Sequence, residues 1–193
     1  MILGLTGGIG CGKTTTAKML VAHGLVPLDS DAIIREILQN DRAVIVAIRA
    51  HFGPGVFAGS DVVSRSRLAR RVFSDEAALR WLEDLLHPRL YAYWRTAFSA
   101  QPSRSWVVEV PLLFEKSLQN WFDFTVCVAS HPSVQLARLE QRGLSPPLAR
   151  KRISKQLPLA QKIVLADFVL LNDGSSDFLR DQVATLVSSL STL

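Results

Sequence analysis

A glycine-rich segment near the start of this chain sets the strongest limit on its fold. An apolar run at residues 2–6 leads into the sequence GGIGCGKT at residues 7–14, and helical periodicity then continues to Gly24. This order predicts a buried strand, a tight loop and a helix. Glycines tolerate backbone conformations that other residues avoid, so the loop can curl closely between the two elements. A chain built this way is expected to form an α/β fold around a parallel sheet.

The same loop has the chemistry of a phosphate cradle. It fits G-x-x-x-x-G-K-[ST] completely and lies between a strand and a helix, as that pattern requires. Inward N–H groups and the positive end of the helix attract an anion. Lys13 can reach terminal phosphates, and the Thr14 hydroxyl can ligate Mg²⁺. The alternative, a plain glycine turn, does not account for the full pattern. The predicted nucleotide contacts are Gly8, Gly10, Cys11, Gly12, Lys13, Thr14 and Thr15.

The rest of the chain continues the alternation of strands and helices. Short apolar runs predict strands at residues 25–28, 106–110, 124–129 and 168–171. Periodicity predicts helices at residues 32–51, 64–73, 76–98, 134–142, 150–156 and 178–190, with Ser74 and Asp75 capping the third of these. Residues 143–147 are expected to break the helical pattern. The prediction is a three-layer α/β/α fold with a five-stranded parallel sheet.

One stretch is too long for a simple crossover between parallel strands. It lies between the second and third predicted strands and is helical throughout. We therefore expect a single domain whose core is residues 1–31 and 101–193. Residues from about 32 to 100 would form a helical insertion that binds the second substrate. Residues from about 138 to 156 would form a small lid.

Composition narrows the class of protein. The chain has 193 residues, of which 48% are hydrophobic and 20% charged, enough for one compact core. A net charge of +5 favours polyanionic partners, although a basic surface alone explains it equally well. No stretch has 18 uncharged apolar residues, so a cytoplasmic location without membrane contact is expected. Cys11 and Cys127 are expected to be free thiols, and Cys11 is not read as catalytic.

Two acids follow the second predicted strand. Asp29 and Asp31 lie where the carboxyl ends of parallel strands border a ligand crevice. Either acid can accept a proton from an attacking hydroxyl or hold Mg²⁺. Either can instead cap the helix that follows. The guanine-reading motif N-K-x-D does not occur, which argues against a GTPase switch.

Several other positions allow two interpretations. Arg138 and Arg142 share a helix face and can close over phosphates, or they form a solvated surface. His87 either contacts substrate or marks a kink before Pro88. The apolar run at residues 112–114 is either an acceptor wall or ordinary core. Glu109, at a strand end, can act near Mg²⁺.

These segments together resemble the dephospho-CoA kinase family from residue 2 to about residue 174. The opening GLTGGIG is similar to the family's start, with Cys11 where the family usually has Ser. Further matches are DSD at residues 29–31, LHP at 86–88, PLLFE at 111–115, Gln135 with Arg138 and Arg142, Arg152 with Gln156, and NDG at 172–174. Ser64 departs from the Asp or Asn that the family often has there, and the neighbouring Arg65 matches.

The resemblance implies ATP-dependent phosphorylation of the ribose 3′-hydroxyl of dephospho-coenzyme A, giving coenzyme A and ADP. It implies ATP and Mg²⁺ as cofactors, and a monomer or weak homo-oligomer that binds no nucleic acid. The implied roles are catalysis by Asp31, Lys13 and Arg138; nucleotide contact by Arg142 and Asn172; acceptor contact by Asp31, Arg65, His87 and Leu112; and Mg²⁺ ligation by Thr14 and Asp31. Glu115 is expected to pair with a basic residue.

Two other readings stay open at this point. One is another small-molecule kinase of the same type, acting on a nucleoside or nucleotide. The other is a nucleotide-gated nucleic-acid-binding module, which the pI of about 9.6 would suit. The sequence lacks the interleaved aromatic and basic residues typical of such a surface.

Overall fold

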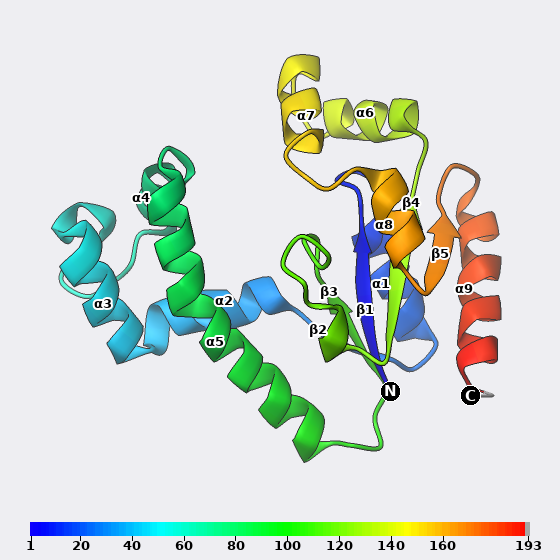
Figure 1. Cartoon of the computed structure of the whole chain (residues 1–193), viewed down its shortest axis with the longest axis horizontal. Helices are drawn as coiled ribbons and strands as arrows, with labels where there is room; N and C mark the ends of the chain where they lie inside the picture. The colour runs from blue at the N-terminus through cyan, green and yellow to red at the C-terminus, as the bar shows by residue number, and fades with distance from the viewer. Residues whose placement is uncertain (192–193) are drawn as a thin grey trace. The chain divides into compact units, whose positions relative to one another are not determined.

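The computed structural model describes residues 1–191. Over these residues the strands form one five-stranded, all-parallel sheet in the order β2-β3-β1-β4-β5 (Figure 1). The strands are β1 (Ile2–Gly7), β2 (Val26–Leu28), β3 (Trp106–Glu109), β4 (Phe124–Ala129) and β5 (Phe168–Leu171). The predicted α/β fold class is confirmed, and each predicted strand lies within one residue of an observed strand at both ends.

The chain separates into two compact units. The core unit is Met1–Leu28 together with the chain from Ser103 onward, and the helical unit is Asp29–Pro102. The α-helices of the core unit are α1 (Lys13–Ala22), α6 (Pro132–Gln141), α7 (Pro146–Ile153), α8 (Leu159–Leu165) and α9 (Ser176–Leu190). Those of the helical unit are α2 (Ser30–Asn40), α3 (Arg42–Phe52), α4 (Arg65–Phe73) and α5 (Glu76–Ala100). Two short 3₁₀ turns are η1 (Pro54–Val56) and η2 (Gln119–Trp121).

The core unit packs helices on both faces of its sheet (Figure 1). Leu3 and Leu5 point from β1 into an apolar cluster with α1 and α9. Gly4 lies between them in sequence and therefore faces the other side. A Cβ at Gly4 would lie 2.6 Å from Phe122 and 2.8 Å from Leu113, so glycine lets the loop after β3 pack directly on β1. This close packing fixes the strand that leads into the glycine loop.

The helical unit has its own apolar core. Buried residues from every one of its helices and from η1 meet in one cluster: Leu38, Val44, Ile48, Val56, Phe57, Val63, Leu68, Val72, Ala78, Leu82 and Leu86. Asp75 caps α5 by accepting hydrogen bonds from the Ala77 and Ala78 amides, as predicted. No described helix in either unit is both long and apolar enough to cross a membrane.

The structure corrects the helix predictions in three places. The single helix predicted at residues 32–51 is two helices, because Asp41 is extended and caps α3 through the Val44 amide at 3.1 Å. Helix α7 begins at Pro146 and not at residue 150, since proline is compatible with a first helical turn. Helix α8 was not predicted. Helix α5 runs through Pro88 from Glu76 to Ala100, so the single helix predicted at residues 76–98 is confirmed.

Candidate active site

The glycine loop connects β1 to α1 and depends on two close backbone approaches. Gly7 has a φ of 140°, and a Cβ there would lie 2.1 Å from the Val128 carbonyl oxygen. Gly12 has a φ of 95°, and a Cβ there would lie 2.2 Å from the Asn172 side-chain nitrogen. Any other side chain would displace β4 or the turn after β5. The loop is therefore shaped by its neighbours on the sheet as well as by its own sequence.

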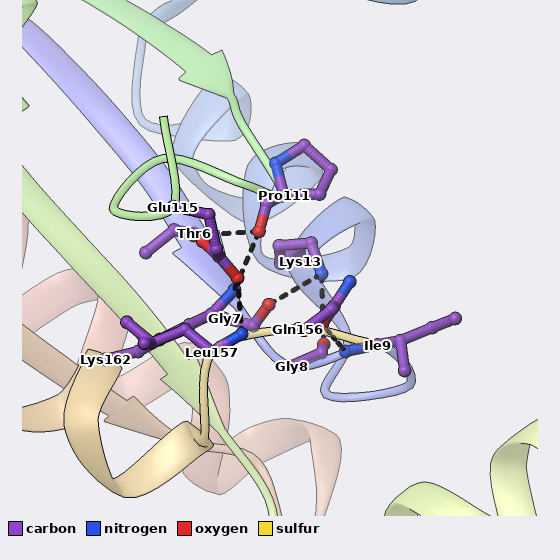
Figure 2. A network of polar contacts seen from close by, with 10 residues as sticks. All are labelled: Thr6, Gly7, Gly8, Ile9, Lys13, Pro111, Glu115, Gln156, Leu157 and Lys162. Atoms are coloured by element: carbon purple, nitrogen blue, oxygen red, sulfur yellow. Dashed lines mark hydrogen bonds and ion pairs between the residues drawn. The ribbon is translucent and has the colours of Figure 1, made fainter. Parts of the chain in front are cut away.

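Lys13 is buried at the start of α1. Its Nζ donates to the Gly7 and Gly8 carbonyl oxygens at 3.1 and 3.0 Å (Figure 2). Burial lowers the pKa of the ammonium below its ordinary value, and nearby Cys11 and Glu109 only partly oppose this. The lysine is therefore a desolvated cation bound to neutral carbonyls. Such a group gains more from meeting an anion than a fully solvated lysine would.

Thr14 and Glu109 come together at the carboxyl ends of β1 and β3. The Thr14 hydroxyl lies 3.2 Å from each carboxylate oxygen of Glu109. Both side chains offer oxygen, the ligand atom that Mg²⁺ prefers, and Mg²⁺ in phosphate sites usually takes few protein ligands. Among the described residues no group of three or more His, Cys, Asp or Glu forms a ready-made metal cage. The donor set fits a Mg²⁺ shared with a bound nucleotide.

A polar network supports the glycine loop from the side of α6 and β5. Arg138 donates to the Gly10 carbonyl at 3.4 Å, to the Ser130 hydroxyl at 3.1 Å and to the Asn172 carbonyl at 2.9 Å. Asn172 in turn donates its side-chain amide to the Cys11 carbonyl at 2.8 Å. In this structure Arg138 and Asn172 therefore bind loop carbonyls. Their predicted roles toward nucleotide stay predictions.

Arg142 is placed differently from Arg138. It forms the C-cap position of α6 and is exposed, and its side chain makes no hydrogen bond or ion pair among residues 1–191. Gln135, also singled out from sequence, is buried and donates to the Ser130 carbonyl at 2.9 Å. Arg138 therefore lies within α6 and is bonded to the loop, whereas Arg142 lies just past the last residue of α6 and has no bond to the loop among residues 1–191.

A second polar network, only part of which was predicted, joins the loop after β3 to α8 (Figure 2). Glu115 pairs with Lys162 at 2.8 Å, which confirms the predicted basic partner. Lys162 is fully buried and also donates to the Pro111 carbonyl at 2.9 Å. Sequence reasoning missed Lys162 and Ser130. The one available signal was a lysine inside the short apolar segment that forms α8.

The apolar run at residues 112–114 follows β3, and its residues differ in burial, so the choice between core and acceptor wall differs from one residue to the next. Leu113 is fully buried and packs beside Gly4, so it belongs to the core. Leu112 and Phe114 are half-buried.

Burial raises the pKa of both cysteine thiols, that of Cys127 to about 12, so neither is suited to act as a nucleophile.

The acids after β2 take distinct roles in the helical unit. Asp29 is the N-cap of α2 and accepts from the Ala32 amide at 2.9 Å, so the capping interpretation is correct for Asp29. Its other oxygen lies 3.4 Å from Arg35. Asp31 lies in the first turn of α2, exposed, with no side-chain hydrogen bond or ion pair among the described residues.

The remaining acceptor candidates also lie in the helical unit. Arg65 is the first residue of α4 and is exposed. His87 is half-buried on α5, with its ring centroid 5.7 Å from that of Tyr91. Asp31, Arg65 and His87 therefore project from three different helices. Lys13, Thr14, Arg138 and Asn172, by contrast, meet around one loop of the core unit.

Comparisons with known proteins agree with this geometry. A family model described as dephospho-CoA kinase matches residues 1–177. The dephospho-CoA kinase of Syntrophotalea carbinolica is 38% identical over 194 residues, covering 98% of this chain and 92% of its own length. That of Thermosynechococcus vestitus is also 38% identical, over 97% of this chain and 94% of its own.

Solved structures show the same fold. The crystal structure of TT1252 from Thermus thermophilus is 32% identical with a TM-score of 0.85, covering 98% of this chain and 97% of that one. A dephospho-CoA kinase from Campylobacter jejuni shares the fold at 23% identity, with a TM-score of 0.75 and coverage of 99% and 97%. From its phosphate loop to the turn after β5, the chain belongs to the dephospho-CoA kinase family.

Proposed function

We propose that this chain transfers the γ-phosphoryl group of ATP to the ribose 3′-hydroxyl of dephospho-coenzyme A, giving coenzyme A and ADP. The observation that carries the proposal is the glycine loop, with its buried Lys13 and the Thr14–Glu109 pair. This loop occurs in a chain that belongs to the dephospho-CoA kinase family. The reaction is the last step of coenzyme A synthesis. It needs a triphosphate held in line with an acceptor hydroxyl.

The core unit would bind the nucleotide. The loop amides and the N-terminus of α1 attract the phosphates, and the predicted contacts are Gly8, Gly10, Cys11, Gly12, Lys13, Thr14 and Thr15. Lys13 would leave the Gly7 and Gly8 carbonyls to reach the terminal phosphates. Because its ammonium is desolvated, this exchange favours the bound phosphate.

Thr14 would ligate the Mg²⁺ that accompanies ATP, with Glu109 beside it and Asp31 as a further candidate. Bound Mg²⁺ supplies charge neutralisation on the phosphate oxygens. The protein's own contribution is to hold Glu109, at the carboxyl end of β3, beside Thr14 in the first turn of α1. That is the edge at which doubly wound sheets bind their ligands.

Asp31 would act as the general base. Its carboxylate would accept the proton of the 3′-hydroxyl as that oxygen bonds to the γ-phosphorus and ADP leaves. Asp29 is occupied as a helix cap, whereas Asp31, three residues after the end of β2, makes no side-chain hydrogen bond or ion pair within residues 1–191. This difference supports Asp31 over Asp29.

The cationic and acceptor contacts are assigned by the same reasoning. Arg142 makes no side-chain hydrogen bond or ion pair among the described residues and would bind phosphate directly, whereas Arg138 would first have to exchange its bonds to the loop. The helical unit would hold dephospho-coenzyme A, with Arg65 and His87 as contacts and Leu112 from the core unit. Residues from about 138 to 156 would act as a lid that excludes water.

A coupled assay of ADP release tests the proposal. Dephospho-coenzyme A should stimulate ADP release far above the rate with water alone, and the product should carry a new 3′-phosphate by mass spectrometry. Nucleosides and nucleoside monophosphates serve as controls for the other kinase reading. Stimulation by a nucleoside and none by dephospho-coenzyme A would overturn the assignment.

A further inference from the structure

Two adjacent residues at the end of the proposed lid are bonded to two different loops of the core unit (Figure 2). The Gln156 side-chain oxygen accepts from the Ile9 amide of the glycine loop at 3.1 Å. The next residue, Leu157, donates its amide to Glu115 at 2.9 Å, in the loop after β3. The chain is therefore held on both sides at this point. Neither contact has a role in the mechanism above.

The contact to Ile9 involves the same peptide group that receives Lys13. The Gly8 carbonyl accepts from Lys13 Nζ at 3.0 Å, and the Ile9 N–H of that peptide donates to Gln156. A peptide group is planar, so fixing the direction of its N–H also fixes the direction of its carbonyl. Gln156 thereby keeps the Gly8 oxygen directed toward Lys13.

Gln156 is itself held in place, through its neighbour Leu157, by an ion pair whose lysine is fully buried and whose carboxylate is 17% exposed. Oε1 of Glu115 accepts from the Leu157 amide and meets the ammonium of Lys162 at 2.8 Å. Lys162 is fully buried and donates in addition to the Pro111 carbonyl. Charged groups away from water keep their partners, because separation would leave an uncompensated buried charge. The position of Leu157, and with it that of Gln156, is therefore fixed.

We propose that Gln156 is a positioning residue for the phosphate loop: it orients the Gly8–Ile9 peptide that receives Lys13, and the Glu115–Lys162 pair holds Gln156 in place. When Lys13 moves to the phosphates, the peptide keeps its orientation through Ile9. Loss of the Gln156 oxygen should then weaken ATP binding more than it slows phosphoryl transfer. The kinetic part of this inference rests on the proposed function, and the structural part does not.

The structural part is tested by hydrogen exchange at the Ile9 amide of the ligand-free full chain, measured by NMR. Gln156→Met keeps the side-chain length and removes the acceptor, so exchange at Ile9 should be about 3- to 10-fold faster, the range set by one hydrogen bond. Gln156→Glu keeps an acceptor oxygen and should retain slow exchange. Gln161→Met is the matched control, because Gln161 is exposed on α8 and its side chain makes no hydrogen bond among the described residues.

The kinetic part uses the same variants with MgATP and dephospho-coenzyme A. Gln156→Met should raise KM for ATP by about 3- to 10-fold and change kcat by less than about twofold. Gln161→Met should change neither. The inference is overturned if Ile9 exchange in Gln156→Met matches the unsubstituted protein, if Gln156→Glu exchanges as fast as Gln156→Met, or if the loss is confined to kcat. Absence of dephospho-CoA-dependent turnover in the unsubstituted protein would instead refute the proposed function, and Ile9 exchange would then decide the inference alone.

Discussion

The charged side chains around the glycine loop of the core unit are more buried than most of those in the helical unit. In the core unit, Lys13 and Lys162 are buried and Arg138 is half-buried. Lys13 and Arg138 donate to backbone carbonyls, and Lys162 pairs with a carboxylate in the loop after β3. In the helical unit three ion pairs are exposed: Arg35–Asp29, Arg49–Asp61 and Arg71–Asp75. The nucleotide side is therefore arranged before ligand arrives. The acceptor candidates Asp31 and Arg65 face water and would gain their partners only with substrate.

The largest effect is expected at Asp31, and it tests whether this exposed acid of the helical unit is chemically distinct from the nearby Asp29. Asp31→Asn should lower kcat by on the order of 10² to 10⁴ while ATP binding is largely kept, since a carboxamide cannot take the hydroxyl proton. Turnover and nucleotide affinity would be measured separately.

Asp29→Asn is the matched control for that substitution. Asparagine caps helices as well as aspartate does, so α2 and the activity should both be preserved. Near-normal turnover in Asp31→Asn would exclude Asp31 as the base. An equal loss in both variants would mean that the two acids are not functionally distinct.

The next effect compares a buried charge pair with an exposed one. Glu115→Gln should cost about 3 to 5 kcal/mol of unfolding free energy, because it leaves the Lys162 ammonium buried without its counter-charge. Urea denaturation measures the loss. The double variant with Lys162→Met should recover much of it, since both charges are then removed.

Asp61→Asn in the helical unit provides the contrast. Its partner Arg49 is 3.3 Å away, and the aspartate side chain is 79% exposed, so little or no change in stability is expected. Equal losses from the buried and exposed pairs would contradict the distinction drawn between the units.

A smaller effect concerns Asp41, which separates α2 from α3. Burial opposes its ionisation, but the Val44 amide and Arg89 outweigh burial and hold the pKa of Asp41 below its ordinary value. The stability that this carboxylate contributes should be present above about pH 4, the ordinary aspartate range, and lost as pH falls through the lowered pKa.

Asp41→Ala should therefore cost about 1 kcal/mol at neutral pH, as the loss of a helix cap usually does, and less in acid. Unfolding measured from pH 2 to 7 checks this, with Asp41→Asn as the variant that keeps the cap but loses the charge. A loss that grows toward acid pH would have the wrong sign.

The last comparison concerns Lys13 in the core unit. The pKa of the Lys13 ammonium is lowered in the folded protein, so as pH rises the folded protein loses the ammonium proton before the unfolded chain does. The cost of burying the ammonium is complete below the lowered pKa and disappears as pH rises toward about 10.5, the ordinary lysine value. The unsubstituted protein should therefore gain stability relative to Lys13→Met over that interval. Denaturation in the absence of nucleotide measures the difference in unfolding free energy between the two proteins. A difference that stays constant or falls as pH rises would refute this prediction.

The sequence was sufficient where local pattern decides the structure. The glycine loop was predictable because each of its positions has a chemical requirement, and the β-strands because their apolar runs are short and bounded. The α2–α3 break was missed because no glycine or proline marks it. The cap residue Asp41 was the available signal, since an aspartate before an apolar segment can start a helix as well as continue one.

Long-range contacts could not be predicted in the same way. Lys162 meets Glu115 across 47 positions of sequence, and Ser130 meets Cys11 across 119. Nothing local distinguishes a lysine that will be buried from one on a surface. The choice between Asp29 and Asp31 also needed the backbone, because capping depends on which residue is extended before the first turn.

The strand order has a consequence for how the protein is made. In the described part of the chain β1 pairs with β3 and β4 alone, and β2 with β3 alone, yet the whole of Asp29–Pro102 is translated between β2 and β3. During translation β1 and its glycine loop therefore have no strand to pair with until β3 has been made. The helical unit, whose contacts are local, can already fold by then. The nucleotide cradle is thus translated before the strands that flank it and is assembled late, so a chain whose synthesis stops before β3 would leave the cradle exposed.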